Sequence, residues 1–308
     1  MSVLRELLAR GAFVVTAEVG PPKGTDRESI KKKCAQLRGF VDAVNITDNQ
    51  TAIVRLSSFA SCLMVREVGL EPVMQLTCRD RNRIALQSDF LGACALGIEN
   101  FLCLTGDHQS LGNHPEARSV FDVDSVQLLA IFRRIRDEGV FANGEKVKGE
   151  VRAFLGAGEN PFADPLEFRV FRLAKKVEAG AQFIQTQAVF DLEMFSRWME
   201  EVRRLKLHEK VHILAGVIPL KSLQALRYMK EEVPGMVVPS WVEERMRKAR
   251  DPKEEGVRIA VETIEALRKI EGVRGVHIMA VAWESVVPDI VKASGLFPRP
   301  GIGGGAGA

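Results

Sequence analysis

The sequence predicts an α/β protein built as a single (β/α)8 barrel, or TIM barrel, and three observations support this prediction. Eight short apolar runs, rich in β-branched residues, recur along the 308 residues. Longer segments with helical periodicity separate these runs, which is the alternation that parallel strands and crossover helices produce. The length also suits such a barrel, for which roughly 250 residues is typical. A doubly wound open sheet is the alternative, although such sheets more commonly contain five or six strands.

The expected strands are nearly continuous apolar runs, as parallel strands covered on both faces require. They are residues 13–19, 42–47, 72–78, 100–105, 151–157, 183–189, 211–217 and 276–282. The expected helices between them carry apolar residues at helical spacing. They are residues 26–39, 52–68, 80–97, 124–138, 165–179, 191–206, 221–232 and 253–271, with a final helix at 284–296. Gly69, Gly97 and Gly180 stand where a helix should stop before the next strand.

Two regions depart from the short connections that such a barrel uses. Residues 106–123 form a long polar loop after the fourth expected strand, and residues 234–252 add a helical piece flanked by prolines. Long loops in compact domains are commonly functional or mobile. No internal boundary is visible, so we expect residues 1–300 to form one domain. The glycine-rich residues 301–308 are expected to be a flexible tail.

Composition restricts the classes of function. The 43 basic and 40 acidic residues give a formal net charge of +3 without a long run of one sign, so no nucleic-acid-binding face is expected. No stretch of about 18 apolar residues exists that would span a membrane. Residues 1–15 predict a short amphipathic helix, because Glu6 interrupts any signal-like apolar run. Five scattered cysteines without a C-x-x-C pair indicate free thiols, so we expect a cytoplasmic protein without a disulfide framework.

Polar side chains gather where the expected strands end. In a (β/α)8 barrel, ligand-binding and catalytic residues lie at the C-terminal ends of the strands and in the loops that follow. Glu18 ends the first strand and is the leading candidate. Because an apolar environment disfavours a charged carboxylate, Glu18 would hold a proton there and serve as a general acid. The alternative is a structural ion pair between Glu18 and a lysine or arginine of the barrel.

Several other candidates allow two interpretations. Asp107 follows Gly106 and is either a carboxylate that faces a ligand or a turn residue. Gln187 either donates to a ligand or belongs to a satisfied polar layer, and Lys176 is either solvated or near a phosphate. Two histidines of the long loop lack a carboxylate or thiol partner at ligand spacing, so no metal site is predicted. The absence of a G-x-G-x-x-G after a strand argues against a separate dinucleotide-binding domain.

In order and spacing, a series of short motifs resembles the methylenetetrahydrofolate reductase family. The motifs are TAEVGPPKG (16–24), NITDN (45–49), QLTCRDRNR (75–83), LTGD (104–107), GAGENPFADP (156–165), AKKVEAGAQFIQTQAVFD (174–191), GVIP (216–219) and VPSW (238–241). Each motif is short, and the resemblance extends over residues 10–298.

The resemblance implies a flavin, FAD or FMN, bound over the C-terminal mouth of the barrel. The reduced flavin passes a hydride from N5 to the methylene carbon of the tetrahydrofolate substrate. Glu18 matches the residue that protonates the folate as its five-membered ring opens. Asp107 matches an aspartate near the flavin and the pterin, and Gln187 matches a folate contact. Thr47, Gln75 and Lys176 fall at flavin contacts, and Phe121 matches an aromatic residue that packs on the flavin.

The chain also departs from the family pattern around the cofactor and the substrate. Thr105 stands in place of an arginine and Gln75 in place of a histidine. The small residues Gly156 and Ala157 replace an aromatic residue of the cofactor site, and Leu223 replaces a phenylalanine of the substrate site. These departures leave open whether the flavin is FAD or FMN and whether NAD(P)H is the direct electron donor.

The LTGDH pattern and the insertion at 139–150 resemble the branch of the family found in anaerobes. There an iron–sulfur or zinc-containing partner subunit relays electrons, and this chain has no cysteine cluster for such a centre of its own. We also expect an oligomer. Two other functions stay open: a folate-binding methyltransferase barrel that works with a corrinoid partner, and a non-catalytic barrel subunit of a redox complex.

Overall fold

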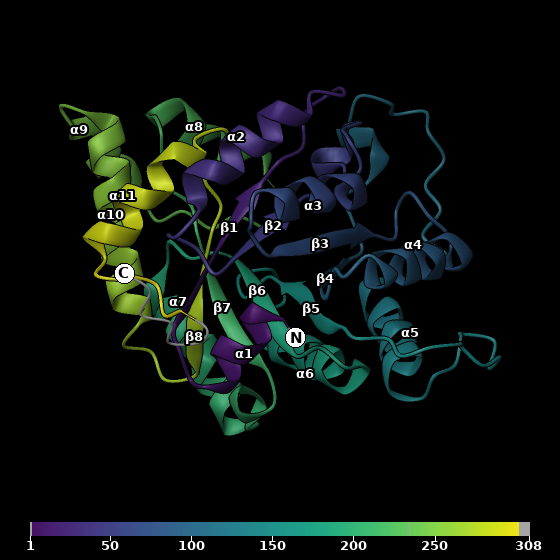
Figure 1. The fold of residues 1–308 in the computed structure, drawn as a ribbon. Helices are drawn as coiled ribbons and strands as arrows, with labels where there is room; N and C mark the ends of the chain where they lie inside the picture. The colour runs from purple at the N-terminus through teal and green to yellow at the C-terminus, as the bar shows by residue number, and fades with distance from the viewer. Residues whose placement is uncertain (1, 234, 302–308) are drawn as a thin grey trace.

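Eight parallel strands close into a barrel in this computed structural model, which describes residues 2–233 and 235–301 (Figure 1). Each strand pairs with the next one along the chain, and β8 returns to pair with β1. The strands are β1 (Val14–Val19), β2 (Ala43–Ile46), β3 (Pro72–Thr77), β4 (Asn100–Leu104), β5 (Phe154–Glu159), β6 (Phe183–Ala188), β7 (His212–Val217) and β8 (Val273–Ile278). The predicted (β/α)8 barrel is therefore confirmed.

Helices surround the barrel and cover its outer face (Figure 1). They are α2 (Arg27–Leu37), α3 (Ser58–Glu67), α4 (Arg83–Ala95), α5 (Ser125–Asp137), α6 (Glu167–Ala179), α7 (Leu192–Arg204), α8 (Leu223–Glu232), α9 (Ser240–Lys248), α10 (Pro252–Leu267) and α11 (Val287–Ala293). Helix α9 is the extra helical piece predicted within 234–252. Short 3-10 turns η1 (Gln50–Ala52), η2 (Gln109–Leu111), η3 (Leu207–Glu209) and η4 (Glu284–Val286) interrupt the loops.

Local signals set the ends of these helices. Asp124 caps α5 by accepting from the backbone N–H of Gln127, whose side chain accepts from the N–H of Asp124 in return, which is a capping box. The three predicted stop glycines have φ of +73°, +79° and +114°, conformations that favour glycine. The predicted helix 52–68 begins late, at Ser58, because Ser57 caps it and η1 occupies residues 50–52.

The predicted N-terminal helix is present as α1 (Val3–Ala9) and closes the lower end of the barrel. Its Leu4, Leu7 and Leu8 are buried and join a cluster inside the barrel that includes Phe154 and Phe183. Burying each such leucine contributes roughly 1.5–3 kcal/mol. Because this end of the barrel is filled with apolar side chains, it leaves the opposite end for a polar ligand.

Two strands sit three residues away from their expected starts. The fifth strand was expected at 151–157, but its pairing with β4 begins at Phe154. The eighth was expected at 276–282, but β8 already begins at Val273. In both cases the apolar run and the paired segment overlap without coinciding, since pairing depends on the neighbouring strand and not on hydrophobicity alone. The earlier start of β8 places His277 near the mouth of the barrel.

Within the described ranges, no helix is long and apolar enough to cross a membrane. The predicted flexible tail lies, except for Gly301, outside the described residues.

Candidate active site

A cavity of about 620 Å³ opens at the C-terminal mouth of the barrel, a size typical of small-molecule sites. Its walls come from the ends of several strands, the loops that follow them and one side of α6. Six residues proposed from the sequence line it: Glu18, Thr47, Gln75, Asp107, Lys176 and Gln187. The barrel therefore brings together residues that are up to 169 positions apart in the chain.

A hydrogen-bonded polar layer forms part of the floor of this cavity. The side chain of Gln185 on β6 exchanges bonds with Asn45 on β2, with donor–acceptor distances of 2.6 and 3.0 Å. Its amide nitrogen also lies 3.1 Å from Oγ1 of Thr16 on β1. Thr16 Oγ1 in turn lies 2.9 Å from Nδ1 of His277 on β8. All four side chains are buried, and buried polar groups are tolerated when they bond to one another in this way.

Glu18 stands above this layer with its side chain about one-fifth exposed to the cavity. Its Oε2 accepts from Gln75 Nε2 at 3.3 Å and lies 3.7 Å from His277 Nε2. Across the described part of the chain, no lysine or arginine forms an ion pair with Glu18 and no hydrogen bond reaches Oε1. The alternative of a structural pair with a basic residue is thus not what the structure shows, and Oε1 is free to meet a ligand.

The hydrogen bonds indicate which nitrogen of His277 carries its proton. Both amide hydrogens of Gln185 are directed at acceptors, one at Asn45 Oδ1 and one at Thr16 Oγ1. The Thr16 hydroxyl can then donate its own hydrogen to His277 Nδ1. In the tautomer that accepts this hydrogen at Nδ1, the ring proton lies on Nε2, the nitrogen that faces Glu18. In that tautomer the floor of the cavity presents an N–H group towards the carboxyl group.

A buried ion pair occupies the opposite side of the mouth. Lys176 Nζ lies 2.7 Å from Glu159 Oε2, and the two side chains are 5% and 1% exposed. The same ammonium donates to the carbonyl of Gly158. Burial lowers the pKa of Lys176, and the Glu159 carboxylate opposes that shift. Arg169 and Arg172 also line the cavity from α6, so this wall offers cations to an anionic group.

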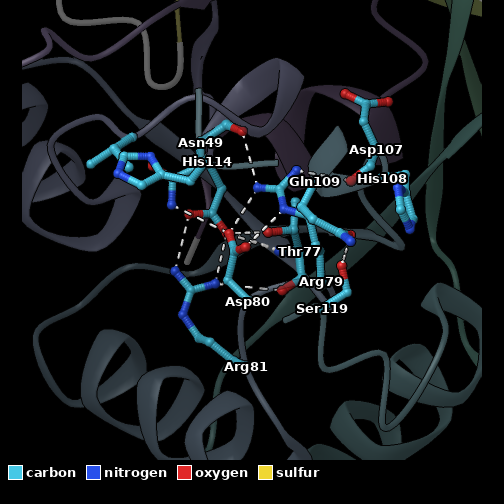
Figure 2. A network of polar contacts seen from close by, with 12 residues as sticks. Asn49, Thr77, Arg79, Asp80, Arg81, Asp107, His108, Gln109, His114 and Ser119 are labelled. Atoms are coloured by element: carbon cyan, nitrogen blue, oxygen red, sulfur yellow. Dashed lines mark hydrogen bonds and ion pairs between the residues drawn. The ribbon is translucent and has the colours of Figure 1, made fainter. Parts of the chain in front are cut away.

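Arg79 joins the loops at the rim, as Figure 2 shows. Its guanidinium donates to the backbone carbonyls of Asn49 and Asp107 at 3.0 and 3.2 Å, and to both carboxylate oxygens of Asp80. Burial would raise the pKa of Asp80, but the bonds from Arg79 outweigh it and lower the pKa below its ordinary value. Arg79 thereby holds the loops after β2 and β4 in fixed relation to the cavity.

The carboxylate of Asp107 points away from the Arg79 guanidinium (Figure 2). Asp107 is exposed and lines the cavity, so its charge is available to a ligand. The two histidines of the long loop bond locally instead. His108 Nδ1 lies 2.8 Å from Ser110 Oγ, and His114 Nδ1 lies 3.1 Å from Asn113 Oδ1.

Four other residues proposed from the sequence do not line this cavity. Phe121 is 37% exposed with φ of +39°, and Leu223 packs against a cluster formed by α8, α9, α10 and the segments that follow β6 and β7. Ala157 is buried in the layer between strands and helices. Gly156 lies in mid-strand, where an added Cβ would approach the Phe183 ring to 2.3 Å. The structure therefore explains Gly156 by the packing of Phe183 beside it.

The sequence reasoning missed His277, Thr16 and the pairing of Asn45 with Gln185. His277 was hidden because the expected eighth strand placed it at the wrong end. It is nevertheless a rare polar residue in the apolar run 276–282, which is the signal that could have found it. Arg79 escaped notice because its role depends on loops that meet only in the folded chain.

In the described residues, no group of three histidine, cysteine, aspartate or glutamate side chains is arranged to hold a metal ion. The five cysteines are free thiols. Burial raises the pKa of Cys78 to about 12, so this thiol is poorly suited to nucleophilic or redox chemistry.

Comparison with known proteins gives a match over nearly the whole chain. The family model described as methylenetetrahydrofolate reductase matches residues 3–295. Methylenetetrahydrofolate reductase 2 of Schizosaccharomyces pombe is 29% identical, with 96% of this chain and 47% of the yeast protein covered. The 5,10-methylenetetrahydrofolate reductase of Pectobacterium carotovorum is 26% identical, with 87% and 85% covered. The chain thus spans about half the length of the yeast relative and most of the bacterial one.

A solved structure shares the fold. An uncharacterized protein from Clostridium thermocellum, described as binding two copies of 5-methyl-5,6,7,8-tetrahydrofolic acid, has a TM-score of 0.67 at 16% identity. The alignment covers 94% of this chain and 98% of that protein. At this identity the likeness shows the barrel fold alone.

Proposed function

The chain belongs to the methylenetetrahydrofolate reductase family, and we propose that it reduces 5,10-methylenetetrahydrofolate to 5-methyltetrahydrofolate in its mouth cavity. The reduction needs a hydride on the methylene carbon and a proton on the ring nitrogen that leaves this carbon. The observation that carries the proposal is Glu18. It is a carboxyl group at the cavity floor, with one oxygen held by Gln75 and the other unbonded within the described chain.

The residues of the cavity fit a flavin. Strands β1 and β5 lie on opposite sides of an eight-stranded barrel, so Glu18 and the cationic wall of α6 stand across the mouth from each other. Lys176, Arg169 and Arg172 would hold the phosphate of the flavin, while Thr47 and Gln75 would bond to its ring on the other side. The flavin would supply the hydride chemistry that protein side chains lack. FAD remains our first choice and FMN the alternative.

Glu18 would act as the general acid. Gln75 donates to Oε2, and no hydrogen bond within the described chain reaches Oε1, so a proton carried on Oε1 would face the cavity. From there Glu18 would deliver it to the ring nitrogen of the folate as the five-membered ring opens. A positioned acid of this kind contributes roughly 10²–10⁴-fold to a rate.

Asp107 and Gln187 would complete the substrate side. The Asp107 carboxylate is exposed at the rim, where its negative charge favours cationic character in the opening folate ring. Gln187 lines the same cavity and offers an amide for hydrogen bonds to the pterin, whose edge carries both donors and acceptors. The Clostridium thermocellum protein that shares this fold is described as binding two copies of 5-methyl-5,6,7,8-tetrahydrofolic acid, which supports the proposal of a folate ligand.

The source of the electrons belongs to the same proposal. NAD(P)H is one candidate donor, and an iron–sulfur or zinc-containing partner subunit is the other. Steady reduction of the purified chain by NADH or NADPH would select the first, and reduction only by an added low-potential donor would select the second.

The proposal is tested first by colour and binding. The purified chain is mixed with FAD or FMN, the excess is removed, and the absorbance of the protein fraction is recorded. We expect a yellow protein that, once reduced by dithionite without oxygen, is reoxidised by 5,10-methylenetetrahydrofolate with formation of 5-methyltetrahydrofolate. A chain that stays colourless with both flavins contradicts the reductase and favours a methyltransferase or non-catalytic barrel.

A further inference from the structure

Glu18 borders a second, smaller pocket of about 90 Å³ besides the mouth cavity. The walls of this side pocket come from α2, from the loop that follows β2 and from the segment that follows β8. Its chemically important lining residues are Glu18, Lys33, Gln50, Arg55, Ala280 and Glu284. The candidate acid therefore stands between two spaces, of which only the larger one has the size for a cofactor and a substrate.

The side pocket is suited to hold water. The Arg55 guanidinium donates through Nη1 to the carbonyl of Pro21 at 2.9 Å, but its Nε is buried and has no hydrogen-bond partner in the described part of the chain. A buried N–H group without a partner is costly, and buried water commonly supplies that partner. One water needs roughly 10–15 Å³ of such space, so the pocket has room for several.

The outer end of the side pocket reaches solvent beside an ion pair. Lys33 Nζ on α2 lies 2.8 Å from Glu284 Oε1 on η4, and the two side chains are 33% and 8% exposed. Val281, which also lines the pocket, is 69% exposed. The pocket thus runs from Glu18 to the surface, with a second carboxylate near its exit.

The proposed reduction uses one proton in each turnover. The methylene carbon gains a hydride, its bond to the ring nitrogen breaks, and that nitrogen takes the proton of Glu18. Glu18 is then a carboxylate and has to regain a proton before the next turnover. Ligands that fill the mouth cavity exclude water from that side, whereas the side pocket stays open to solvent.

We propose that the side pocket is the proton inlet of Glu18, with Glu284 as its relay. A proton from solvent passes to the Glu284 carboxylate and then along the water of the pocket to the Glu18 carboxylate, and no other bond changes. Water chains and carboxyl groups both carry protons in this way. Lys33 holds Glu284 in place and balances its charge. Glu284 does not line the mouth cavity, so it acts only through Glu18, and the inference rests on the proposed role of Glu18 as the acid.

The test compares two rates in Glu284→Gln. In a single turnover Glu18 starts with its proton, so the dithionite-reduced variant should reduce folate at the wild-type rate. In the steady state, with reduced methyl viologen as electron donor, Glu18 has to be reprotonated in every cycle. There kcat should fall at least about tenfold, less than the roughly 10²–10⁴-fold contributed by the acid itself. Added formate, a small weak acid that fits the pocket, should restore part of kcat.

Three further variants separate the relay from a structural role. Glu284→Asp keeps a carboxylate and should keep most of kcat. Lys33→Met breaks the same ion pair but also keeps the carboxylate, so its loss should be smaller than that of Glu284→Gln; an equal loss overturns the relay. Glu255→Gln is the matched control, because Glu255 is similarly buried beside Arg245 but lines neither cavity, and it should change neither rate. Circular dichroism checks that each variant is folded.

A crystal structure of the flavin-free chain gives a readout that does not depend on activity. We expect ordered water in the side pocket within hydrogen-bond distance of Arg55 Nε, and a dry pocket overturns the inlet. Ala280 is 1% exposed and lines the pocket. Ala280→Val adds two methyl groups there, so it should displace this water and lower the steady-state kcat without a response to formate.

The outcomes distinguish the inlet from the function on which it rests. A wild-type chain that reduces no folate contradicts the proposed function, and the inlet with it. A wild-type chain that reduces folate, while Glu284→Gln keeps its steady-state kcat, overturns the inlet alone. Equal losses of the single-turnover and steady-state rates in Glu284→Gln also overturn it, since the residue then supports the fold of the site.

Discussion

Glu18 Oε2 lies 3.7 Å from His277 Nε2, and the two residues come from β1 and β8, the strands that close the barrel. The contact exists only because the last strand returns to the first. His277 is held in turn by Thr16 and, through it, by Gln185 and Asn45. The candidate acid is therefore supported by a buried network that spans four strands, and its position depends on that network.

The first prediction concerns His277. His277→Asn should lower the rate of folate reduction about tenfold, less than the roughly 10²–10⁴-fold that a positioned acid contributes, because Glu18 remains but is less well held. Reduction of bound flavin by its donor should stay within a few-fold of normal. Single-turnover kinetics of the two half-reactions measure both rates. His114→Asn, in an exposed loop, is the control and should change neither. Equal losses in both half-reactions would show that His277 acts on the flavin and not on Glu18.

The buried pair of Lys176 and Glu159 gives the second prediction. Lys176→Met leaves a carboxylate buried without its cation and should destabilise the fold by about 3–5 kcal/mol. Replacing both partners, as in K176M/E159L, should recover a large part of this loss because no unpaired charge remains. Urea unfolding of the flavin-free chain measures the effect. The control Lys175→Met alters the exposed neighbour, and its free energy of unfolding should stay within about 0.5 kcal/mol of the wild-type value. A similarly small change for Lys176→Met would contradict the structural role of the pair.

Asp80 gives a prediction about pH. Arg79 lowers the pKa of Asp80 in the fold, so the unfolded chain takes up this proton first as the pH falls. The carboxylate therefore contributes stability above about pH 4, the ordinary aspartate value, and this contribution is lost as the pH falls through the lowered pKa. Asp80→Asn should cost on the order of 1 kcal/mol or less at pH 7, since the side chain is one-third exposed and screened. The difference in free energy of unfolding between wild type and variant, measured with urea, should shrink as the pH falls below about 4. A difference that widens at low pH would contradict this interpretation.

Gly156 separates a packing role from a cofactor role. Gly156→Ala places a Cβ against the Phe183 ring and should cost about 1–3 kcal/mol of stability, as overpacking of a core does. The affinity of the folded protein for flavin should change less than a few-fold. Thermal unfolding and flavin titration give the two values. Gly24→Ala, which meets no atom within 4 Å, is the control. Weak flavin binding without a loss of stability would contradict the packing role and indicate that Gly156 acts in flavin binding.

Much of the fold is predictable because it follows from local rules. Apolar runs bounded by glycines such as Gly97 and Gly180 mark the strands and helices, and eight repeats favour a closed barrel. Exact strand positions are less predictable, since β5 and β8 are set by pairing with their neighbours. That difference of three residues is why His277 was not recognised as a residue of the mouth, whereas Glu159 already follows the end of the expected fifth strand.

Part of the candidate site can be predicted, because single polar residues at the ends of the strands indicate it. Glu18, Thr47, Gln75, Asp107, Lys176 and Gln187 line one cavity because the C-terminal ends of parallel strands meet there. The supporting contacts could not be predicted in this way. Arg79 bonds to carbonyls of two separate loops, and Asn45 bonds to a residue 140 positions away. Such contacts depend on the register of the closed barrel and not on any local pattern.

The most direct test of the central claim is the pair of half-reactions in Glu18→Gln. The glutamine keeps the size and hydrogen bonds of the side chain but has no proton to give. We predict normal flavin binding, nearly normal flavin reduction by the donor, and folate reduction slowed by about 10²-fold or more. Folate reduction at the wild-type rate in this variant would contradict the account and remove Glu18 from the role of acid.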